Sequence, residues 1–102
     1  MSVPRYTTPT FTLTFTEQGL DLTQAAGVYV TFKQALYEVT KTGDDLEVEQ
    51  KRISVYFSQE ETARFCVGDV EIQANWMTGD RRVCSEIVSY PISDQLLKQV
   101  IE

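Results

Sequence analysis

Residues 10–16 read Thr10-Phe11-Thr12-Leu13-Thr14-Phe15-Thr16, and this stretch decides the fold class of the chain. A large apolar side chain alternates strictly with threonine. Successive side chains of a β-strand point to opposite faces, so this period of two predicts a strand with one face in a core. The branched threonine side chains suit the other face, because they pack well on a pleated surface.

The same period recurs along the chain and predicts a two-sheet sandwich. Residues 82–90 are mixed, because Val83 and Ile87 share one face while Val88 shares the other with two further apolar side chains, so this strand is apolar on both faces or bulged. Turns at 43–45 and 78–80 separate strands, and about seven short strands with such spacing are typical of a sandwich. The other predicted strands are 28–32, one near 36–41, 46–48, 53–57 and 70–76.

The inward faces of these strands predict the hydrophobic core. It consists of large apolar side chains at alternate positions, with Phe65 added from a helical turn. The predicted core residues are Phe11, Leu13, Phe15, Val28, Val30, Phe32, Leu46, Val48, Ile53, Val55, Phe57, Phe65, Val70, Ile72, Ala74 and Trp76.

Two segments carry helix signals. Ser58-Gln59-Glu60-Glu61 has the spacing of a capping box and predicts one short helical turn near 59–65, which crosses between the sheets. The tail from Ser93 to Ile101 predicts a second short helix, with Leu96, Leu97 and Val100 among its apolar positions, which docks on its own domain or on a partner.

The length, net charge and residue composition of the chain limit the possible classes of function. The chain has 102 residues, so we expect a single domain over residues 1–102. It carries 9 Lys+Arg against 15 Asp+Glu, a net charge of −6, which argues against binding to nucleic acid or to an anionic membrane. It has no His, which removes Ser-His-Asp triads, Cys-His dyads and HExxH zinc sites.

The cysteines and the N-terminus indicate a reducing compartment. Cys66 and Cys84 would lie roughly 30 Å apart in the predicted hairpin, far beyond the about 6 Å that a disulfide spans. We therefore expect two reduced thiols that behave as small apolar residues. No signal peptide or membrane span is present in the sequence, so the expected location is cytoplasmic unless an assembly carries the chain out.

Motifs for catalysis or cofactor binding are weak. The acidic run 44–49 alternates with apolar residues, so we interpret it as a turn followed by a solvated strand face and not as a calcium site. Glu71 and Glu86 are the candidates for a carboxylate pair across the hairpin, but they are expected on an open sheet face and not in a cleft. No glycine-rich phosphate loop occurs. We expect no catalytic residue, no metal and no cofactor.

The aromatic residues are the candidate binding residues. Several lie partly on faces opposite the core pattern, where they would form a flat platform for a sugar or a protein. The alternative is that strand tyrosines simply cover an outer sheet face with their hydroxyls in water. The candidates are Tyr29, Tyr37, Tyr56, Trp76 and Tyr90.

Other polar residues have ordinary interpretations. Arg81 and Arg82 beside the hairpin turn are expected to be a solvated tip. Gln34 and Gln73 are expected to be solvent-exposed, with bridging to neighbouring backbone as the alternative.

A resemblance adds a functional expectation. The segments VYVTFKQ at 28–34, SQEETARF at 58–65 and VEIQANW at 70–76 follow the first strand in an order that resembles small prophage-encoded proteins of Gram-positive gut bacteria. The architecture is similar to the N-terminal sandwich domain of phage baseplate upper proteins. The resemblance covers most of residues 10–92, rests on packing and capping motifs, and carries over no catalytic residue.

The resemblance implies an immunoglobulin-like antiparallel sandwich and a non-enzymatic structural or adaptor role in a phage tail or baseplate. The expected partners are other tail or baseplate proteins, or further copies of this chain, and the protein would then be virion-associated. The alternative function is a carbohydrate- or peptide-binding module that uses the aromatic outer face.

Overall fold

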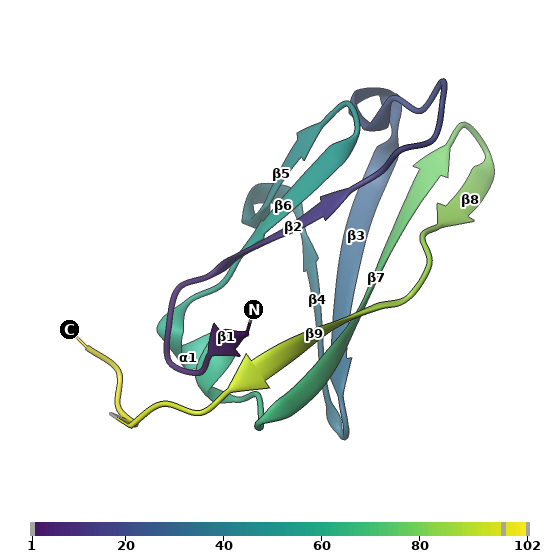
Figure 1. The fold of residues 1–102 in the computed structure, drawn as a ribbon. Helices are drawn as coiled ribbons and strands as arrows, with labels where there is room; N and C mark the ends of the chain where they lie inside the picture. Colours follow the sequence, from purple (N-terminus) through teal and green to yellow (C-terminus); the bar gives the residue numbers. More distant parts are fainter. Residues whose placement is uncertain (1, 97, 102) are drawn as a thin grey trace.

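The computed structural model describes residues 2–96 and 98–101, and strands are the main regular structure of this part of the chain (Figure 1). Three short helical segments interrupt them: 3-10 turns at Leu22–Gln24 and Gly43–Asp45, and helix α1 at Gln59–Ala63. The strands are β1 (Val3–Pro4), β2 (Thr10–Thr14), β3 (Ala26–Gln34), β4 (Tyr37–Thr42), β5 (Leu46–Glu49), β6 (Arg52–Tyr56), β7 (Gly68–Thr78), β8 (Arg81–Cys84) and β9 (Val88–Ser93).

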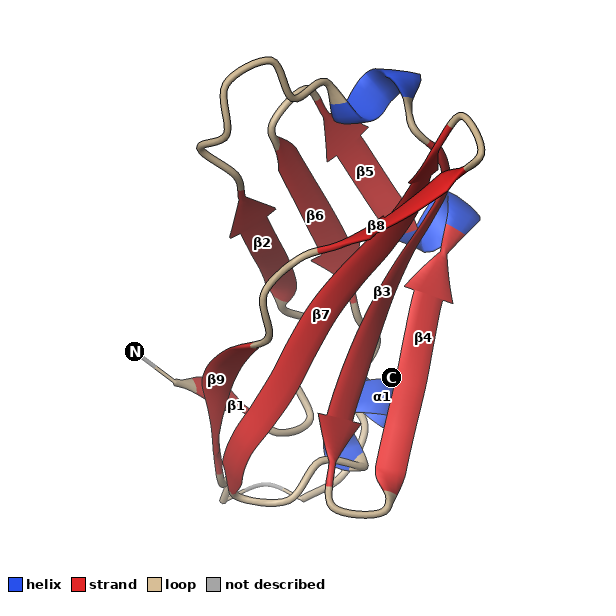
Figure 2. Cartoon of the chain, turned by 90° about the vertical axis from the view of Figure 1, so that its right-hand side faces the viewer, coloured by secondary structure: helices blue, strands red, loops and turns tan. Residues whose placement is uncertain are grey.

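The strands form two sheets that lie face to face, which confirms the all-β sandwich (Figure 2). The larger sheet has the order β1-β9-β7-β3-β4, with β8 also pairing β7, and the smaller one has the order β2-β6-β5. Pairing is antiparallel except between β1 and β9, which run parallel. The prediction of about seven strands missed β1 and took β8 and β9 as one strand.

The core lies between the sheets and follows the predicted alternation. Phe11 of β2 contacts Phe32 of β3 across the sandwich, with ring centroids 5.1 Å apart. It also contacts Phe57, which follows β6 in its own sheet, at 5.3 Å. Most predicted core residues are buried; the half-buried ones are Leu13, Phe15, Val28, Leu46 and Val48. The buried apolar residues that the pattern missed are Val3, Leu22 and Ile92.

A bulge divides the segment predicted as one strand over 82–90. The turn at 78–80 joins β7 to β8, and Cys84 pairs with Asn75 as expected. The next pair is Val88 with Ile72, so Val88 lies four residues after Cys84 while Ile72 lies only three residues before Asn75. The β8–β9 segment therefore has one extra residue opposite β7. Ser85 fills the irregularity: its backbone N–H donates to the Ala74 carbonyl at 2.8 Å, and its hydroxyl accepts from the Ala74 N–H at 2.9 Å. The bulged interpretation is therefore confirmed.

Helix α1 carries the chain from β6 in one sheet to β7 in the other, as predicted. The Ser58 hydroxyl accepts from the Glu61 N–H at 3.2 Å, and a Glu61 carboxylate oxygen accepts from the Ser58 N–H at 2.9 Å. Both halves of the capping box are thus present. Thr62 is buried and donates to the Thr7 carbonyl at 2.7 Å, which fixes the helix to the segment before β2.

The predicted C-terminal helix is wrong for the described residues, which form no helix after β9. Ser93 is the last residue of β9, and its carbonyl accepts from the Arg5 N–H at 3.0 Å, so it does not begin a helix. The tail leaves the sheets (Figure 1) and is held by Gln59, whose side-chain amide bonds both the N–H and the carbonyl of Ile101. Leu97, which the prediction includes, lies outside the described residues.

Three polar expectations also need correction. Cys66 and Cys84 are free thiols, but both are exposed and do not act as buried apolar residues. Gln34 is not simply solvated: its side chain accepts from the Cys66 N–H at 2.6 Å and donates to the Cys66 carbonyl at 2.7 Å. Gln73 donates to the Ser85 carbonyl at 3.0 Å, so the bridging alternative holds for both amides.

Candidate binding surfaces

The structure does not bring the five predicted aromatic binding residues together. Trp76 is only 4% exposed, because it lies on the inner face of β7 and meets the ring of Phe15 edge-on at 5.6 Å. The placement follows from the strand period itself, which puts Trp76 on the same side as the other buried residues of β7. Trp76 is therefore a core residue.

Tyr37 and Tyr90 are half-buried and also face inward. The ring of Tyr37 packs edge-on against Phe65 at 5.2 Å, and the ring of Tyr90 packs edge-on against Phe11 at 5.5 Å. Burial is the main cause that raises the pKa of the Tyr37 phenol above its usual value. Both rings close the margins of the core and leave little aromatic surface for a ligand.

Tyr29 and Tyr56 are exposed, but on the outer faces of different sheets. Tyr29 projects from β3 in the larger sheet, and Tyr56 projects from β6 in the smaller one. The Tyr56 hydroxyl donates to a Glu47 carboxylate oxygen at 2.5 Å, and this hydrogen bond raises the pKa of Tyr56. A single platform cannot contain both tyrosines, so any binding at either is local.

Tyr29 borders a hollow of about 380 Å³ on the outer face of the larger sheet. Its wall includes two polar side chains, Asn75 and Arg82, which are linked by a 3.2 Å hydrogen bond from the guanidinium to the amide oxygen. The remaining lining residues are Gly27, Thr31, Thr40, Trp76 and Met77. Arg82 is exposed, as predicted for a solvated tip, although it also forms this contact.

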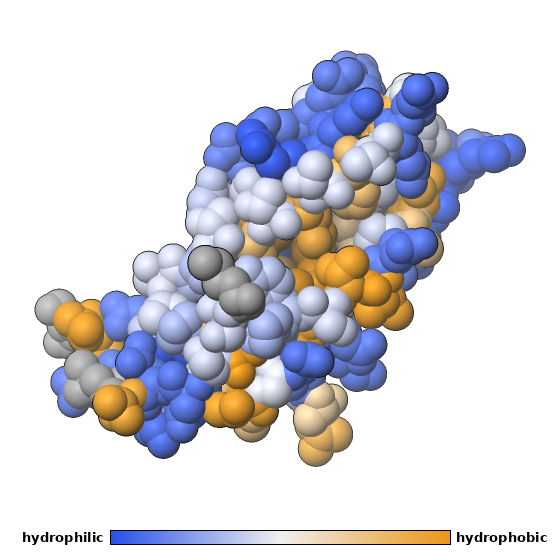
Figure 3. All heavy atoms as spheres, viewed as in Figure 1, coloured by the Kyte–Doolittle hydropathy of each residue, from blue (hydrophilic) through white to orange (hydrophobic). Residues whose placement is uncertain are grey.

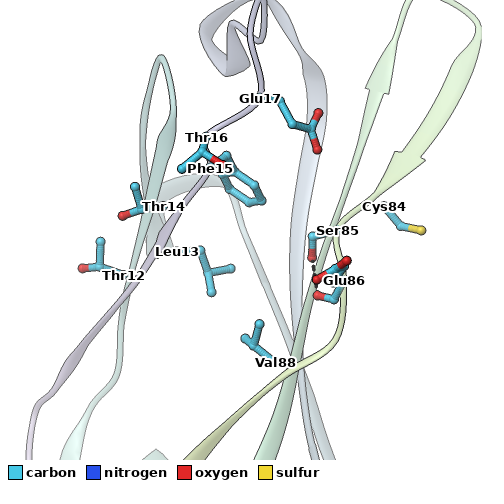
Figure 4. Close-up of a pocket in the computed structure, with 10 residues that line it drawn as sticks. All are labelled: Thr12, Leu13, Thr14, Phe15, Thr16, Glu17, Cys84, Ser85, Glu86 and Val88. Atoms are coloured by element: carbon cyan, nitrogen blue, oxygen red, sulfur yellow. Dashed lines mark hydrogen bonds between the residues drawn. The ribbon is translucent and has the colours of Figure 1, made fainter.

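A larger groove, of about 510 Å³, lies between β2 and the β8–β9 margin where the two sheets part. β2 and the residues after it supply Leu13, Phe15 and Glu17, and the bulge supplies Ser85 and Glu86 (Figure 4). Val88 completes the apolar part of the wall. Hydrophobic surface is visible in this region, near the middle of the face drawn in Figure 3.

The sequence pattern gave only a partial signal for this groove. The mixed faces of 82–90 gave a bulge as one of two alternatives, and Val83, Ile87 and Val88, in or beside the bulge, are exposed. The position of β2 at the edge of a three-stranded sheet depends on pairings between distant residues, and period alone does not specify such pairings.

The candidate carboxylates are separated by the fold. Glu71 lines a different hollow, on the outer face of the larger sheet, and Glu86 lines the groove beside β2. Glu47 and Glu49 lie exposed on the outer face of β5, as interpreted from the sequence, and Glu49 forms an ion pair with Arg52 at 2.5 Å. Within residues 2–96 and 98–101, no three His, Cys, Asp or Glu side chains lie close enough together to hold a metal ion.

Lys41 is an ionisable side chain that the core pattern missed. It occupies the inward position of edge strand β4 after Tyr37 and Val39, and it is 4% exposed. Its ammonium forms an ion pair with Glu61 and lies 4.5 Å from the ring centroid of Phe57. Burial raises the pKa of Glu61, but the hydrogen bonds from Lys41 and Ser58 outweigh this and hold it below its usual value.

The comparisons with known proteins give no relative for this chain: no family model, no curated protein and no solved structure matches it. No helix in the described part of the chain is long and apolar enough to cross a membrane.

Proposed function

We propose that this chain is a non-enzymatic structural or adaptor protein that acts through protein–protein packing, as a component of a phage or prophage tail or baseplate. The observation that carries the packing role is the open margin of the sandwich, where the groove beside β2 meets exposed apolar side chains of the β8–β9 segment. Exposed apolar surface beside an unpaired sheet edge is typical of interaction sites.

The assembly itself is proposed from the resemblance of residues 10–92 to prophage-encoded sandwich proteins. The two facing sheets, with the orders β1-β9-β7-β3-β4 and β2-β6-β5, support the sandwich part of that resemblance, and the immunoglobulin-like form is proposed with it. Partners would be other tail or baseplate proteins or further copies of this chain, and the protein would be virion-associated in the finished particle.

The proposal is tested on particles and on the purified chain. We expect mass spectrometry of purified tail particles to detect this chain in a fixed ratio to the known tail subunits. Light scattering should also show the purified chain forming a complex with one of those subunits. A strict monomer that joins no tail subunit and is absent from the particles would contradict the proposal.

A second candidate function is carbohydrate binding at Tyr29. The observation that favours it is the hollow beside this exposed ring, which offers the Asn75 amide and the Arg82 guanidinium. Sugars stack on aromatic faces while their hydroxyls bond amides and guanidinium groups. Tyr29→Ala should abolish binding on a glycan array, while Tyr56→Ala, on the opposite sheet, should leave it unchanged. An empty array with the unaltered chain would remove this candidate.

A further inference from the structure

Strand β2 has one edge without a partner in the described part of the chain. It pairs only with β6, and the Phe15 N–H donates across that pair to the Lys51 carbonyl at 2.8 Å. Backbone groups of alternate residues in a strand point to opposite sides, so the odd-numbered residues bond β6. The N–H and carbonyl groups of Thr10, Thr12 and Thr14 therefore face the free edge, spaced for one further strand.

The other free edges carry features that oppose strand addition. β4 turns Lys41 inward and carries Glu38, and β5 is short and acidic. β8 begins with two arginines. β1 covers the outer edge of β9 at Ile92 and Ser93, and the part of β9 before them contains Pro91. Charged residues, inward-pointing charges and proline are the usual protections of a sheet edge. β2 contains neither charge nor proline, so it is the least protected edge among the described strands.

The groove beside this edge fits the side chains that an added strand would bring. Leu13 and Phe15 point from β2 toward the segment 85–88, while Thr12 and Thr14 point away (Figure 4). A residue paired with Leu13 in an added strand would share its face and enter the groove above Val88. The next residue along would point to solvent, so the fitting segment has an apolar side chain at every second position.

Charge favours a basic partner over a second copy of this chain. The charged residues that line the groove are Glu17 and Glu86, both exposed and both acidic. Neither forms an ion pair within residues 2–96 and 98–101. A second copy would bring a net charge of −6 against another −6.

We propose that the free edge of β2 and its groove bind an extended segment of a partner protein, with alternate apolar side chains in the groove and Lys or Arg beside Glu17 and Glu86. The added strand would continue the smaller sheet as β5-β6-β2-partner. This inference deepens the proposed function and rests on it, because the occupant is taken to be a protein.

The first test uses a synthetic peptide of about nine residues, in which valine alternates with threonine and lysine stands at both ends. In amide hydrogen exchange, the peptide should slow Thr12 and Thr14 by about tenfold or more, because their N–H groups become bonded. The amides of Leu13 and Phe15, already bonded to β6, should change much less. Two control peptides, one with glutamate in place of lysine and one with the valines adjacent, should bind about tenfold more weakly at low salt.

A matched pair of variants tests the edge itself. Thr12→Pro removes an N–H that faces away from β6, so the fold should tolerate it while peptide binding falls by about tenfold or more. Thr12→Val keeps the N–H and the branched shape, and should bind as the unaltered chain does. If circular dichroism shows that Thr12→Pro is unfolded, the test rests on the unaltered chain. There the peptide must slow exchange of the Thr12 and Thr14 amides and leave those of Leu13 and Phe15 little changed.

Two results would overturn the inference: no binding of the basic peptide at millimolar concentration, or binding that leaves the Thr12 and Thr14 amides unprotected. Neither would refute the proposed function, since a chain found in tail particles would then associate through another surface. Conversely, peptide binding by a chain absent from particles would support the edge site and contradict the assembly.

Discussion

The ion pair between Lys41 and Glu61 supplies the sharpest test of how this sandwich is held together. The Lys41 side chain is almost wholly buried, while the Glu61 side chain is 33% exposed. Glu61 also completes the capping box of α1 through the Ser58 N–H. Lys41 depends on Glu61 more than Glu61 depends on Lys41. Removing Glu61 should therefore lower the free energy of unfolding more than removing Lys41.

Glu61→Ala should destabilise the fold strongly. It leaves the Lys41 ammonium buried without its partner, a change that costs about 3–5 kcal/mol in fully buried pairs. Water that reaches the partly exposed Glu61 site reduces this cost, while the lost capping contact adds roughly 0.5–1 kcal/mol. We expect a loss of about 2–4 kcal/mol, a substantial share of the about 5–15 kcal/mol of unfolding free energy typical of a domain of this size.

Lys41→Met should cost far less. Methionine keeps the unbranched stem and packs well against an aromatic ring such as Phe57. Glu61 remains partly solvated and keeps its bond to Ser58, so it is not stranded in the core. Replacing a buried charge by an apolar side chain of similar length is often neutral or stabilising, and we expect a change of about 1 kcal/mol or less in either direction.

Urea unfolding followed by fluorescence measures these costs, because Trp76 is the single tryptophan and is buried. The double variant Lys41→Met/Glu61→Ala should recover most of the loss seen in Glu61→Ala, giving a coupling of about 1–3 kcal/mol. Equal losses in both single variants, or strict additivity in the double variant, would refute the reasoning.

The same pair predicts an acid dependence. The pKa of Glu61 is lowered in the folded state, so the folded chain binds fewer protons than the unfolded chain just below the usual pKa of 4.5. The stability from this group is present above that value and is lost as the pH falls through the lower folded-state pKa. Lys41→Met should therefore flatten the dependence of unfolding free energy on pH below about pH 5, and an unchanged slope would contradict this assignment.

Two further predictions concern side chains that satisfy backbone groups. Ser85→Ala leaves the Ala74 N–H without its acceptor, so unfolding free energy should fall by about 1–2 kcal/mol, while Ser89→Ala at an exposed site should change it by less than about 0.5 kcal/mol. Gln34→Ala removes both bonds to Cys66, so the Cys66 amide should exchange with solvent about tenfold faster or more by NMR, and unchanged exchange would show that the pair contributes nothing.

The sequence predicted the sandwich and most of its core because one rule governs both. Inward positions of strands alternate, and the alternation of β7 is visible in Val70, Ile72, Ala74 and Trp76. The same rule places Trp76 in the core, which conflicts with its inclusion among the candidate binding residues. The rule failed at Lys41, which takes an inward position with a charge because Glu61 lies on the helix opposite.

The remaining differences arise from contacts between distant residues. β1 is two residues long and is a strand only because Val3 pairs with Ile92. Serine is a residue type that often caps a helix. Ser93 instead ends β9, where it pairs with Pro4 and its carbonyl accepts from the Arg5 N–H. The groove beside β2 exists because strand order leaves that edge open, and local propensity contains no information on strand order.

Salt separates the two kinds of association that an open β2 edge permits. Pairing between two copies joins strands that carry no charge, but each chain has a net charge of −6, so the two chains repel each other. Salt screens this repulsion and should therefore strengthen self-association. Binding of a basic segment beside Glu17 and Glu86 is attractive, so screening should weaken it. Sedimentation at about 0.05 M and 0.5 M salt, with and without the lysine-ended peptide, should therefore show opposite trends. Peptide binding that does not weaken with salt would mean that the apolar groove alone selects the partner, and that the two glutamates have no part in recognition.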